Sequence, residues 1–293
     1  AFALLSATIL NKEAFCRQVG LDPDRVALVD VEHTFPVENR PLYDVTQGKM
    51  TYEHRGETLP KIARLIVRLM AHHPDENGLI HAHSYAIAEE LADRLAEFGV
   101  GSRVRTHTKA SRDDELTAWK ASDDPEVFIA VKMEEALDLN GDLARWQVLC
   151  KAPYLNTNDS RVARRLEDDQ WAWYHRTALR TVIQACGRVV RAPDDYGATY
   201  LADSSLLDLF DRAAADMPPW FREQVDRCSQ PTLPAFDPAA AVAEIDGSAG
   251  TGSRQRSVTQ HRNESASSSG QTRTDADADQ RADHPLSDVW GDG

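Results

Sequence analysis

Residues 184–203, QACGRVVRAPDDYGATYLAD, join a polar stretch with two arginines to a short apolar run. The polar part ends a long segment over residues 169–190 that we expect to be helical. The apolar part, Ala198–Ala202, contains the β-branched and aromatic residues of a buried strand. The stretch therefore predicts a helix, a turn and a buried strand in direct succession.

Three polar side chains of this stretch share one face if the helix forms. Gln184, Arg188 and Arg191 are spaced i, i+4 and i+7, and Gly187 between them would let another backbone approach closely. Two guanidiniums on one face suit a polyphosphate, because each presents a planar, permanently charged fork to phosphoryl oxygens. The spacing alone favours a simpler interpretation, a surface helix with solvated arginines.

Strands and helices alternate along the rest of the chain. We expect strands at 78–83, 103–106, 127–131 and 147–150, and helices at 58–73, 84–98, 111–119 and 204–212. Thr58, Ser84 and Ser111 stand at expected N-cap positions. This alternation predicts an α/β fold with a mostly parallel sheet covered by helices on both faces. Ligands of such sheets bind at the carboxyl ends of strands, here after His83, Val131 and Cys150.

The composition excludes several classes of protein. Of the 293 residues, 42% are hydrophobic and 27% charged, which fits one or two globular domains and no fibrous class. The net charge of −14 gives no general attraction to polyanions, so a nucleic-acid site would have to be a local patch. No apolar run approaches the ~18 residues of a membrane span and no signal segment opens the chain, so we expect a cytoplasmic protein.

Metal-binding patterns are weak in this sequence. The cysteines at positions 16, 150, 186 and 228 form no C-x-x-C pair, so we expect reduced thiols and no zinc knuckle or iron–sulfur run. His81 and His83 alternate along an expected strand and would point to the same face. Because no third ligand is near them in the sequence, we favour packing or polar contacts over a metal pair.

The composition changes near Pro231. Residues 231–293 are rich in Ala, Asp, Ser, Gly, Thr and Gln, and cannot bury enough apolar area to offset the entropy of ordering them. We therefore expect a disordered acidic tail over 231–293. The tail contains an i, i+3, i+4 pattern at Leu286, Val289 and Trp290 that could fold on a partner. We favour the interpretation that the tail binds no partner.

The motif at 184–191, with D-D-Y-G at 194–197, resembles motif VI of superfamily 2 helicases, and specifically of the XPD/DinG family. Five further segments agree with that family in order: residues 4–10 (LLSATIL) with motif III, 35–40 (FPVENR) with its F-P-x-E-N-R segment, 83–85 (HSY) with motif IV, 133–142 (MEEALDLNGD) with motif V, and 151–159 (KAPYLNTND) with the stretch before the long helix. Six ordered segments over about residues 3–212 are far more specific than any single one.

The resemblance implies a RecA-like second motor domain over 58–230, a connector over 11–57, and at 1–10 the last strand of a first motor domain upstream of Ala1. The lack of an initiator Met agrees with this expectation. The chain has no G-x-x-x-x-G-K-[ST], and Asp30-Val31-Glu32-His33 only superficially resembles a D-E-A-H box. Phosphate-binding lysine, Mg²⁺ ligands and any iron–sulfur cluster would then lie upstream, and this chain alone would not hydrolyse ATP.

The resemblance also assigns roles within an ATP-dependent DNA helicase that translocates on single-stranded DNA, for example in DNA repair. Arg188 and Arg191 would be arginine fingers on ATP bound between the two motor domains with Mg²⁺. The other implied roles are ATP binding by Gln184, Gly187, Glu135 and Asp138, coupling by Ser6 and Thr8, and DNA binding by Ser84, Tyr85 and Tyr154.

Some features leave other interpretations open. Glu134 and Ala136 replace the small hydroxyl residue and the Gly of motif V, which allows a non-catalytic module that binds nucleic acid or a partner. A small-molecule α/β enzyme with an accidental likeness is a second alternative. The basic cluster Arg161, Arg164 and Arg165 would either follow a DNA backbone near the same cleft as Arg188 or form a solvated helix face.

Overall fold

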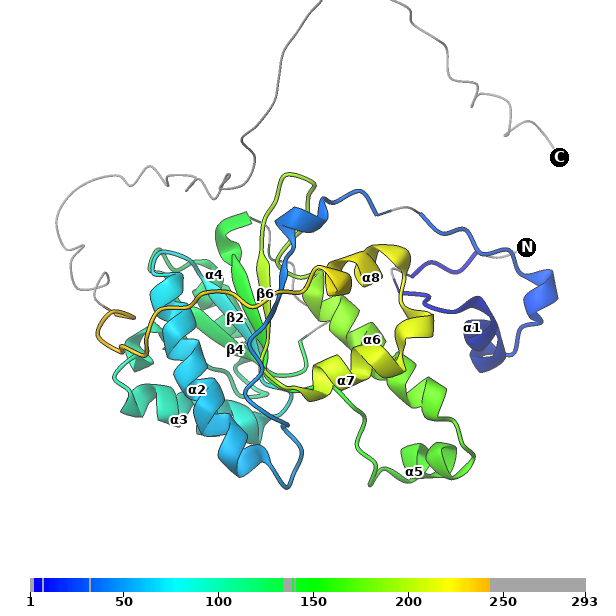
Figure 1. Cartoon of the computed structure of the whole chain (residues 1–293), viewed down its shortest axis with the longest axis horizontal. Helices are drawn as coiled ribbons and strands as arrows, with labels where there is room; N and C mark the ends of the chain where they lie inside the picture. The colour runs from blue at the N-terminus through cyan, green and yellow to red at the C-terminus, as the bar shows by residue number, and fades with distance from the viewer. Residues whose placement is uncertain (1–2, 7, 32, 134–138, 140, 243–293) are drawn as a thin grey trace, which may run out of the picture. The chain divides into compact units, whose positions relative to one another are not determined.

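The computed structural model describes residues 3–6, 8–31, 33–133, 139 and 141–242. Their centre is a six-stranded sheet in the order β1-β6-β5-β2-β4-β3, in which every neighbouring pair is parallel (Figure 1). The strands are β1 (Leu42–Asp44), β2 (Gly78–His81), β3 (Val104–Arg105), β4 (Val127–Ala130), β5 (Trp146–Leu149) and β6 (Ala198–Leu201). The prediction of an α/β fold with a parallel sheet is confirmed.

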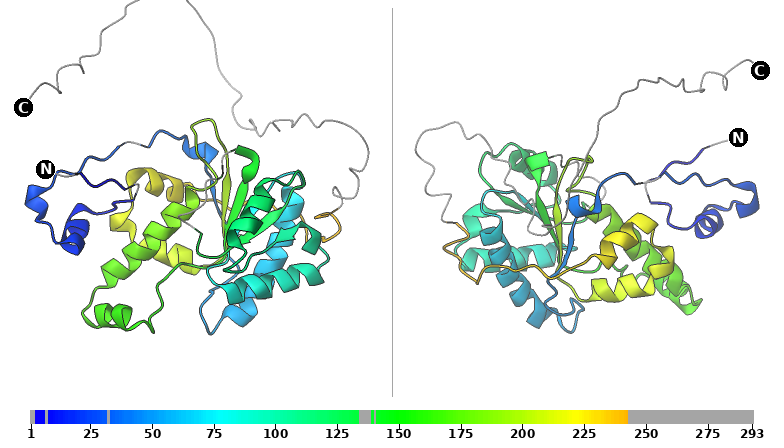
Figure 2. Two further views of the ribbon diagram at one scale, coloured as in Figure 1. Left: turned by 180° about the vertical axis from the view of Figure 1, so that it is seen from behind. Right: turned by 45° about the horizontal axis from the view of Figure 1, so that its top comes forward.

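Helices cover both faces of the sheet (Figure 2). The α-helices are α1 (Lys12–Val19), α2 (Arg55–His72), α3 (Tyr85–Glu97), α4 (Arg112–Lys120), α5 (Ser160–Glu167), α6 (Trp171–Cys186), α7 (Ser205–Arg212) and α8 (Pro219–Asp226). Short 3-10 turns are η1 (Pro23–Arg25), η2 (Val37–Asn39), η3 (Gly101–Arg103), η4 (Gly141–Leu143) and η5 (Ala214–Asp216).

Successive residues of each central strand serve different apolar layers. Ile80 and Val148 pack in one cluster with buried residues of α2 and α3, such as Ile66. Leu149 and Leu201 pack in another with residues of α6 and α7. Full burial of one such side chain contributes about 1.5–3 kcal/mol, so each face of the sheet needs its helices.

Two of the three expected helix starts, at Ser84 and Ser111, are confirmed, and the start at Thr58 is wrong. Ser84 caps α3 by accepting from the Ile87 amide, as predicted. Helix α2 begins at Arg55, and the Thr58 hydroxyl donates to the Lys49 carbonyl at 3.0 Å instead of capping. Ser111 stands at the N-cap position of α4 as predicted, although its hydroxyl accepts from the Thr108 amide and makes no cap bond.

Helix α6 ends at Cys186, four residues before the predicted end at 190. Val189 and Val190 are 0% and 4% exposed and join the apolar cluster of β2 and β4, which draws the chain off the helix axis. A Cβ atom on Gly197 would lie 2.6 Å from Cγ2 of Val189, so only glycine lets the two passes of the chain meet. The prediction that Arg188 and Arg191 share a helical face with Gln184 is therefore wrong.

The first residues do not pair with this sheet. Described residues 3–6 and 8–10 have no strand conformation, and Leu5 is 97% exposed. The strand predicted over 1–10 belongs to the sheet of a first motor domain, so it stays a prediction. The connector predicted over 11–57 contributes β1, which was too short and too polar to identify from the sequence.

The predicted disordered tail does not begin at Pro231. Arg68 donates to the carbonyls of Leu233 and Pro234, the guanidinium of Arg64 lies over the ring of Phe236, and Ala241 is 1% exposed. With the Ala241 carbonyl, which accepts from Arg103 of η3, these contacts fix the segment on α2 and η3. Residues 243–293, with Leu286, Val289 and Trp290, lie outside the described residues.

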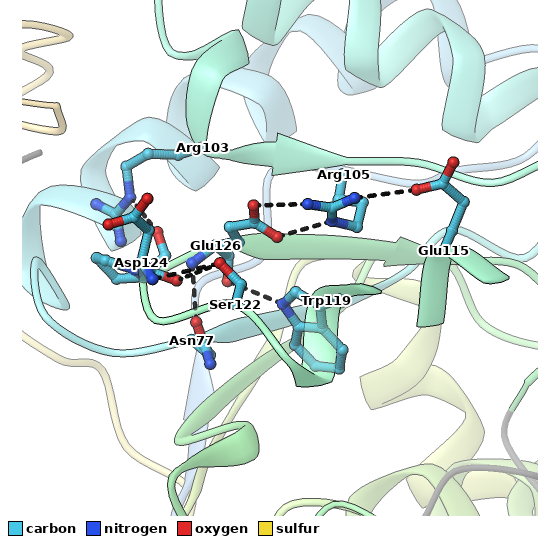
Figure 3. A network of polar contacts seen from close by, with 9 residues as sticks. Asn77, Arg103, Arg105, Glu115, Trp119, Ser122, Asp124 and Glu126 are labelled. Atoms are coloured by element: carbon cyan, nitrogen blue, oxygen red, sulfur yellow. Dashed lines mark hydrogen bonds and ion pairs between the residues drawn. The ribbon is translucent and has the colours of Figure 1, made fainter. Parts of the chain in front are cut away.

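Three residues that lie far apart in the sequence fix the outer strand β3 (Figure 3). The Arg105 guanidinium binds both carboxylate oxygens of Glu126 at 2.7 and 2.8 Å and also the Glu115 carboxylate at 3.1 Å. Bidentate contacts of this kind are directional as well as charged. They join β3, the start of β4 and α4.

Two other expectations concern the whole described chain. All four cysteines are free, and three of them are buried. Among the described helices, none combines the length and the apolar character that crossing a membrane requires.

Candidate functional site

The loops at the carboxyl edge of the sheet contain two strained residues, one of which lies next to predicted DNA-binding side chains. His83 has φ 65° directly before Ser84 and Tyr85, and Lys132 has φ 54° two residues after the end of β4. A left-handed residue other than glycine costs on the order of 1–3 kcal/mol and persists only where its surroundings require it. Such strain clusters at binding sites, and here it marks the ends of two adjacent strands, β2 and β4.

The carboxyl edge also concentrates lysine in a chain that is acidic as a whole. Of the seven lysines in the sequence, Lys49, Lys109, Lys132 and Lys151 follow β1, β3, β4 and β5. The first three are exposed, although Lys49 is paired with Asp208 at 3.0 Å. Burial lowers the pKa of Lys151, an effect that Asp203 opposes and Arg55 reinforces. Because β1 and β3 are the two edge strands, these lysines are spread along the whole carboxyl edge of the sheet.

The two tyrosines predicted to bind DNA differ in accessibility. Tyr85 begins α3 and is 39% exposed. Tyr154 is half-buried, and one face of its ring stacks on Tyr174 with centroids 5.2 Å apart. Burial raises the pKa of Tyr154, and neighbouring groups change it less. Tyr85 is therefore the better placed of the two for stacking on a base.

A buried carboxylate organises the loop after α6. Asp195 Oδ2 accepts from the Arg191 amide at 3.0 Å, and its Oδ1 accepts from the Tyr196 amide at 3.0 Å and from Arg145 Nη1 at 2.6 Å. Arg145 also binds the Asp142 carboxylate at 2.8 Å. These contacts, which the sequence pattern did not reveal, fix the backbone that carries Arg191.

The loop brings the two predicted arginine fingers together without a shared helix. Arg188 Nε donates to the Gln184 carbonyl at 3.1 Å, and Arg188 is half-buried. Arg191 is exposed, and its Nη1 lies 3.5 Å from the carbonyl of Gly187. The two guanidiniums thus contact backbone carbonyls that lie three residues apart, those of Gln184 and Gly187.

The N-terminal segment reaches the end of α6. Gln184 Nε2 donates to Thr8 Oγ1 at 3.4 Å, and the Thr8 amide donates to Ser6 Oγ at 3.3 Å. Asn11 next to them donates to Asp216, which also binds Arg176 at 3.0 Å. The structure thus joins the two residues predicted for coupling to one predicted for ATP binding.

The F-P-V-E-N-R segment packs beside the same loop. Asn39 donates from its side chain to the Pro193 carbonyl at 2.9 Å and accepts from the Gly197 amide at 3.0 Å. Arg40 is 6% exposed and exchanges hydrogen bonds of 2.6 Å with Gln224. Burial lowers the pKa of Arg40, which nearby Glu223 opposes. Asn39 therefore binds the loop directly, and Arg40 anchors the same segment to α8, contacts that the sequence alone could not give.

His33 belongs to this supporting layer and to no D-E-A-H box. Its ring stacks on Trp220 with centroids 4.4 Å apart, and its Nδ1 accepts from the Phe35 amide. Burial and then the charge of Arg40 lower its pKa, against the hydrogen bond from Phe35. His33 is held as a neutral packing residue.

A row of buried polar side chains crosses the α6 face of the sheet. His81 Nε2 and Gln147 Oε1 are 2.9 Å apart, and Gln147 Nε2 donates to Thr199 Oγ1 at 2.8 Å. The expected polar role of His81 is confirmed, but β2 ends at His81, so His83 does not continue the strand. No group of three potential metal ligands lies together in the part of the chain that the structure describes.

The basic cluster of α5 lies away from the loop after α6. Arg161 pairs with Asp159 at 3.0 Å, Arg164 with Asp168 at 3.5 Å, and Arg165 stacks over Trp173. Helix α5 packs on α6, whose 16 residues span about 24 Å. Because Arg188 follows the far end of α6, the expectation of one shared cleft is wrong, and a solvated helix face with local partners explains the cluster.

The predicted motif V residues Glu135 and Asp138, with the altered positions Glu134 and Ala136, lie outside the described residues. Their roles stay predictions. Met133 directly before this segment and Leu139 directly after Asp138 are both buried in the apolar cluster of β2 and β4.

Comparisons with known proteins agree with the motif order. A family model described as helicase C-terminal domain matches residues 66–224, more than half of the chain. The chain is 28% identical over 205 residues to the ATP-dependent DNA helicase chl-1 of Caenorhabditis elegans, with 62% of this chain and 24% of that protein covered. It is 26% identical over 232 residues to the human regulator of telomere elongation helicase 1, with 66% and 19% covered.

Among solved structures, an XPD apo structure is 19% identical, with a TM-score of 0.47 and coverage of 68% of this chain and 41% of that one. The chain spans about a fifth to a quarter of the length of the two curated relatives. The family match and the order of the motifs agree on one assignment. This chain belongs to the helicase C-terminal domain family.

Proposed function

We propose that this chain is the C-terminal motor domain of an ATP-dependent DNA helicase that moves along single-stranded DNA. ATP would bind at a cleft that this domain shares with a first motor domain. The observation that carries the proposal is the Asp195-ordered loop, which holds Arg191 beside Arg188 directly after α6. Family membership and the helicase names of the relatives support the same class of activity.

On the nucleotide side, Arg188 and Arg191 would bind the phosphates of ATP. Guanidinium donors match phosphoryl oxygens, and a positively charged fork stabilises the charge that develops during phosphoryl transfer. The fixed backbone of Arg191 supports this role, because a pre-organised donor loses less entropy when the phosphate arrives. Gln184 and Gly187 would complete the contacts of this loop.

The Gln184–Thr8 hydrogen bond supports a coupling role for the N-terminal segment. Gln184 lies in the last turn of α6, directly before the loop that carries the two arginines. Thr8, which Gln184 binds, is hydrogen-bonded to Ser6. A change at the phosphates could move this contact and shift the segment that carries Ser6 and Thr8. Coupling of this kind needs two arrangements of the contact, each favoured by one nucleotide state.

On the DNA side, the single strand would cross the carboxyl edge of the sheet. Ser84 and Tyr85 follow β2, and Lys132 follows β4. Hydroxyl and ammonium groups bind phosphates, and an exposed ring stacks on a base for about 1–3 kcal/mol. Tyr154 would contact the strand only through the uncovered part of its ring.

Mg²⁺ would accompany ATP, as it does in phosphoryl transfer generally. The described residues offer no group of three ligands, so no metal ligand is assigned to this chain and no step is derived through the ion. The phosphate-binding lysine motif G-x-x-x-x-G-K-[ST] is likewise absent from the sequence. We therefore expect this chain by itself to bind single-stranded DNA and to hydrolyse no ATP.

The test measures binding of the whole chain to fluorescein-labelled oligothymidine by fluorescence anisotropy, with Tyr85→Ala and Trp171→Ala as matched variants. Both side chains are exposed aromatics, at 39% and 48%, but Trp171 starts α6 beside the arginine cluster of α5. We expect about tenfold weaker binding with Tyr85→Ala and little change with Trp171→Ala. No binding by the wild-type chain, or a loss only with Trp171→Ala, would contradict the proposed DNA path.

A further inference from the structure

His107 lies in the loop after β3 and is used by none of the motifs described above. It is 7% exposed, and its ring stacks on Phe128 with centroids 5.5 Å apart and an angle of 7°. Both ring nitrogens have backbone partners: Nε2 accepts from the Val131 amide at 3.1 Å, and Nδ1 lies 3.0 Å from the Thr108 carbonyl. Since Nε2 accepts, the ring proton is on Nδ1, which donates to Thr108.

One side of His107 fixes the end of β4. The amide that it binds belongs to Val131, and the next residue is Lys132 with φ 54°. The left-handed backbone of Lys132 needs an external restraint, because a residue with a Cβ atom does not adopt it freely. The Nε2 acceptor supplies a restraint one residue before the turn that presents the Lys132 ammonium.

The other side of His107 contacts Tyr85. The two rings meet edge to face, with centroids 5.6 Å apart and an angle of 76°. Tyr85 follows the second strained turn, at His83 with φ 65°. An edge-to-face contact fixes the tilt of a ring while leaving other parts of it accessible.

We propose that His107 is a positioning residue that holds Tyr85 and Lys132 together in the geometry that binds single-stranded nucleic acid. The inference rests on the proposed function, and it adds to that function a residue which itself does not touch the strand. Packing alone does not account for a histidine at this position. A phenylalanine would stack on Phe128 equally well, but it would leave the buried Val131 amide without its acceptor.

Two substitutions at His107 separate its hydrogen bond to the Val131 amide from its ring contact with Tyr85. His107→Phe keeps a ring against Phe128 and Tyr85 and removes the acceptor for Val131. His107→Gln keeps an acceptor of similar reach and removes the ring. His72→Gln, at an exposed histidine near the end of α2, is the matched control. Each is measured in the whole chain by anisotropy with labelled oligothymidine of about 15 nucleotides, a length near the usual site size.

We expect His107→Phe and His107→Gln each to weaken binding by about fivefold to tenfold, and His72→Gln to leave it unchanged. Combination with alanine at the positioned residue tests the mechanism by a double-mutant cycle. When Lys132 is already alanine, His107→Phe should lower the affinity for oligothymidine almost no further. When Tyr85 is already alanine, His107→Gln should likewise lower that affinity almost no further. General destabilisation would instead lower affinity equally in every background.

Circular dichroism melts identify which variants are folded at the assay temperature. One folded variant of His107 is enough to test the positioning role. Binding as tight as wild type by a folded variant, or an undiminished loss in the alanine backgrounds, would overturn the positioning role. If the wild-type chain itself fails to bind, the proposed function is overturned and this inference with it. The two failures are therefore distinguishable by the wild-type measurement.

Discussion

The carboxylate of Asp195 accepts a hydrogen bond from the backbone amide of Arg191 at 3.0 Å, so one buried side chain fixes the position of an exposed arginine. The same carboxylate binds Arg145 at 2.6 Å. Arg145 in turn lies at the start of β5, which ties the loop to the centre of the sheet. The loop that carries the proposed phosphate ligands is thus rigid at its base.

Asp195→Ala should lower the free energy of unfolding by about 2–3 kcal/mol, because it leaves the Arg191 and Tyr196 amides without their acceptor and removes one of the two carboxylates that bind Arg145. Urea denaturation of the whole chain measures this change. Asp194→Ala is the control, since Asp194 is exposed and its loss should stay within about 0.5 kcal/mol. Equal effects of the two substitutions would contradict the central role of Asp195.

Gly197→Ala should destabilise the chain by about 1–3 kcal/mol, because the new methyl group would lie 2.6 Å from Val189 Cγ2 and 2.7 Å from its carbonyl oxygen. The matched change is Gly56→Ala in α2, where a Cβ atom meets nothing within 4 Å. That change should stabilise by about 0.4–1 kcal/mol. The shift in urea midpoint checks both signs, and a neutral Gly197→Ala would refute the close approach.

Arg103→Met should cost about 3 kcal/mol and release the segment at 231–242. The guanidinium is 2% exposed and donates to the carbonyls of Pro125 at 2.9 Å and Ala241 at 2.8 Å, among others. Limited proteolysis should then cut between residues 231 and 242, where the wild-type chain resists. Arg112→Met, at an exposed arginine of α4, should leave the digestion pattern unchanged. An unaltered pattern in Arg103→Met would mean that other contacts suffice to hold the segment.

Thr8→Val should uncouple ATP use from movement on DNA in the full-length product of the gene that encodes this chain. The substitution keeps the shape of the side chain and removes the partner of Gln184. We expect DNA-stimulated ATP hydrolysis to persist while unwinding falls several-fold, which paired ATPase and strand-displacement assays measure. Thr232→Val, at an exposed threonine, controls for the chemical change. Parallel loss of both activities would indicate a structural role for Thr8.

The regular core was predictable because its patterns are local. The four central strands and the helices at 84–98 and 204–212 follow from apolar periodicity and capping, and the structure places them within a few residues. The end of α6 was not predictable, because it depends on a tertiary contact. Val189 leaves the helix and packs against Gly197. The docking of 231–242 was missed for the same reason, since the arginines that hold it come from α2 and from the turn η3.

The candidate site divides in the same way. Gln184, Arg188 and Tyr85 were identifiable from motifs, because the chemistry of phosphate and base binding restricts which residues can serve. Asp195, Arg40 and His107 were not assigned supporting roles, since their partners are backbone atoms or side chains distant in the sequence. A histidine in a loop after a short strand gives no sign in the sequence that both of its nitrogens are bound.

DNA-stimulated ATP hydrolysis by the full-length gene product, compared between wild type, Arg191→Ala and Arg161→Ala, tests the central claim most directly. Arg161 is an equally permanent charge, but it is exposed on α5 and paired locally with Asp159. The account predicts a loss of about a thousandfold or more in kcat with Arg191→Ala, unchanged affinity for single-stranded DNA, and wild-type activity with Arg161→Ala. Wild-type ATP hydrolysis by a folded Arg191→Ala protein would contradict the assignment of this loop to the phosphates.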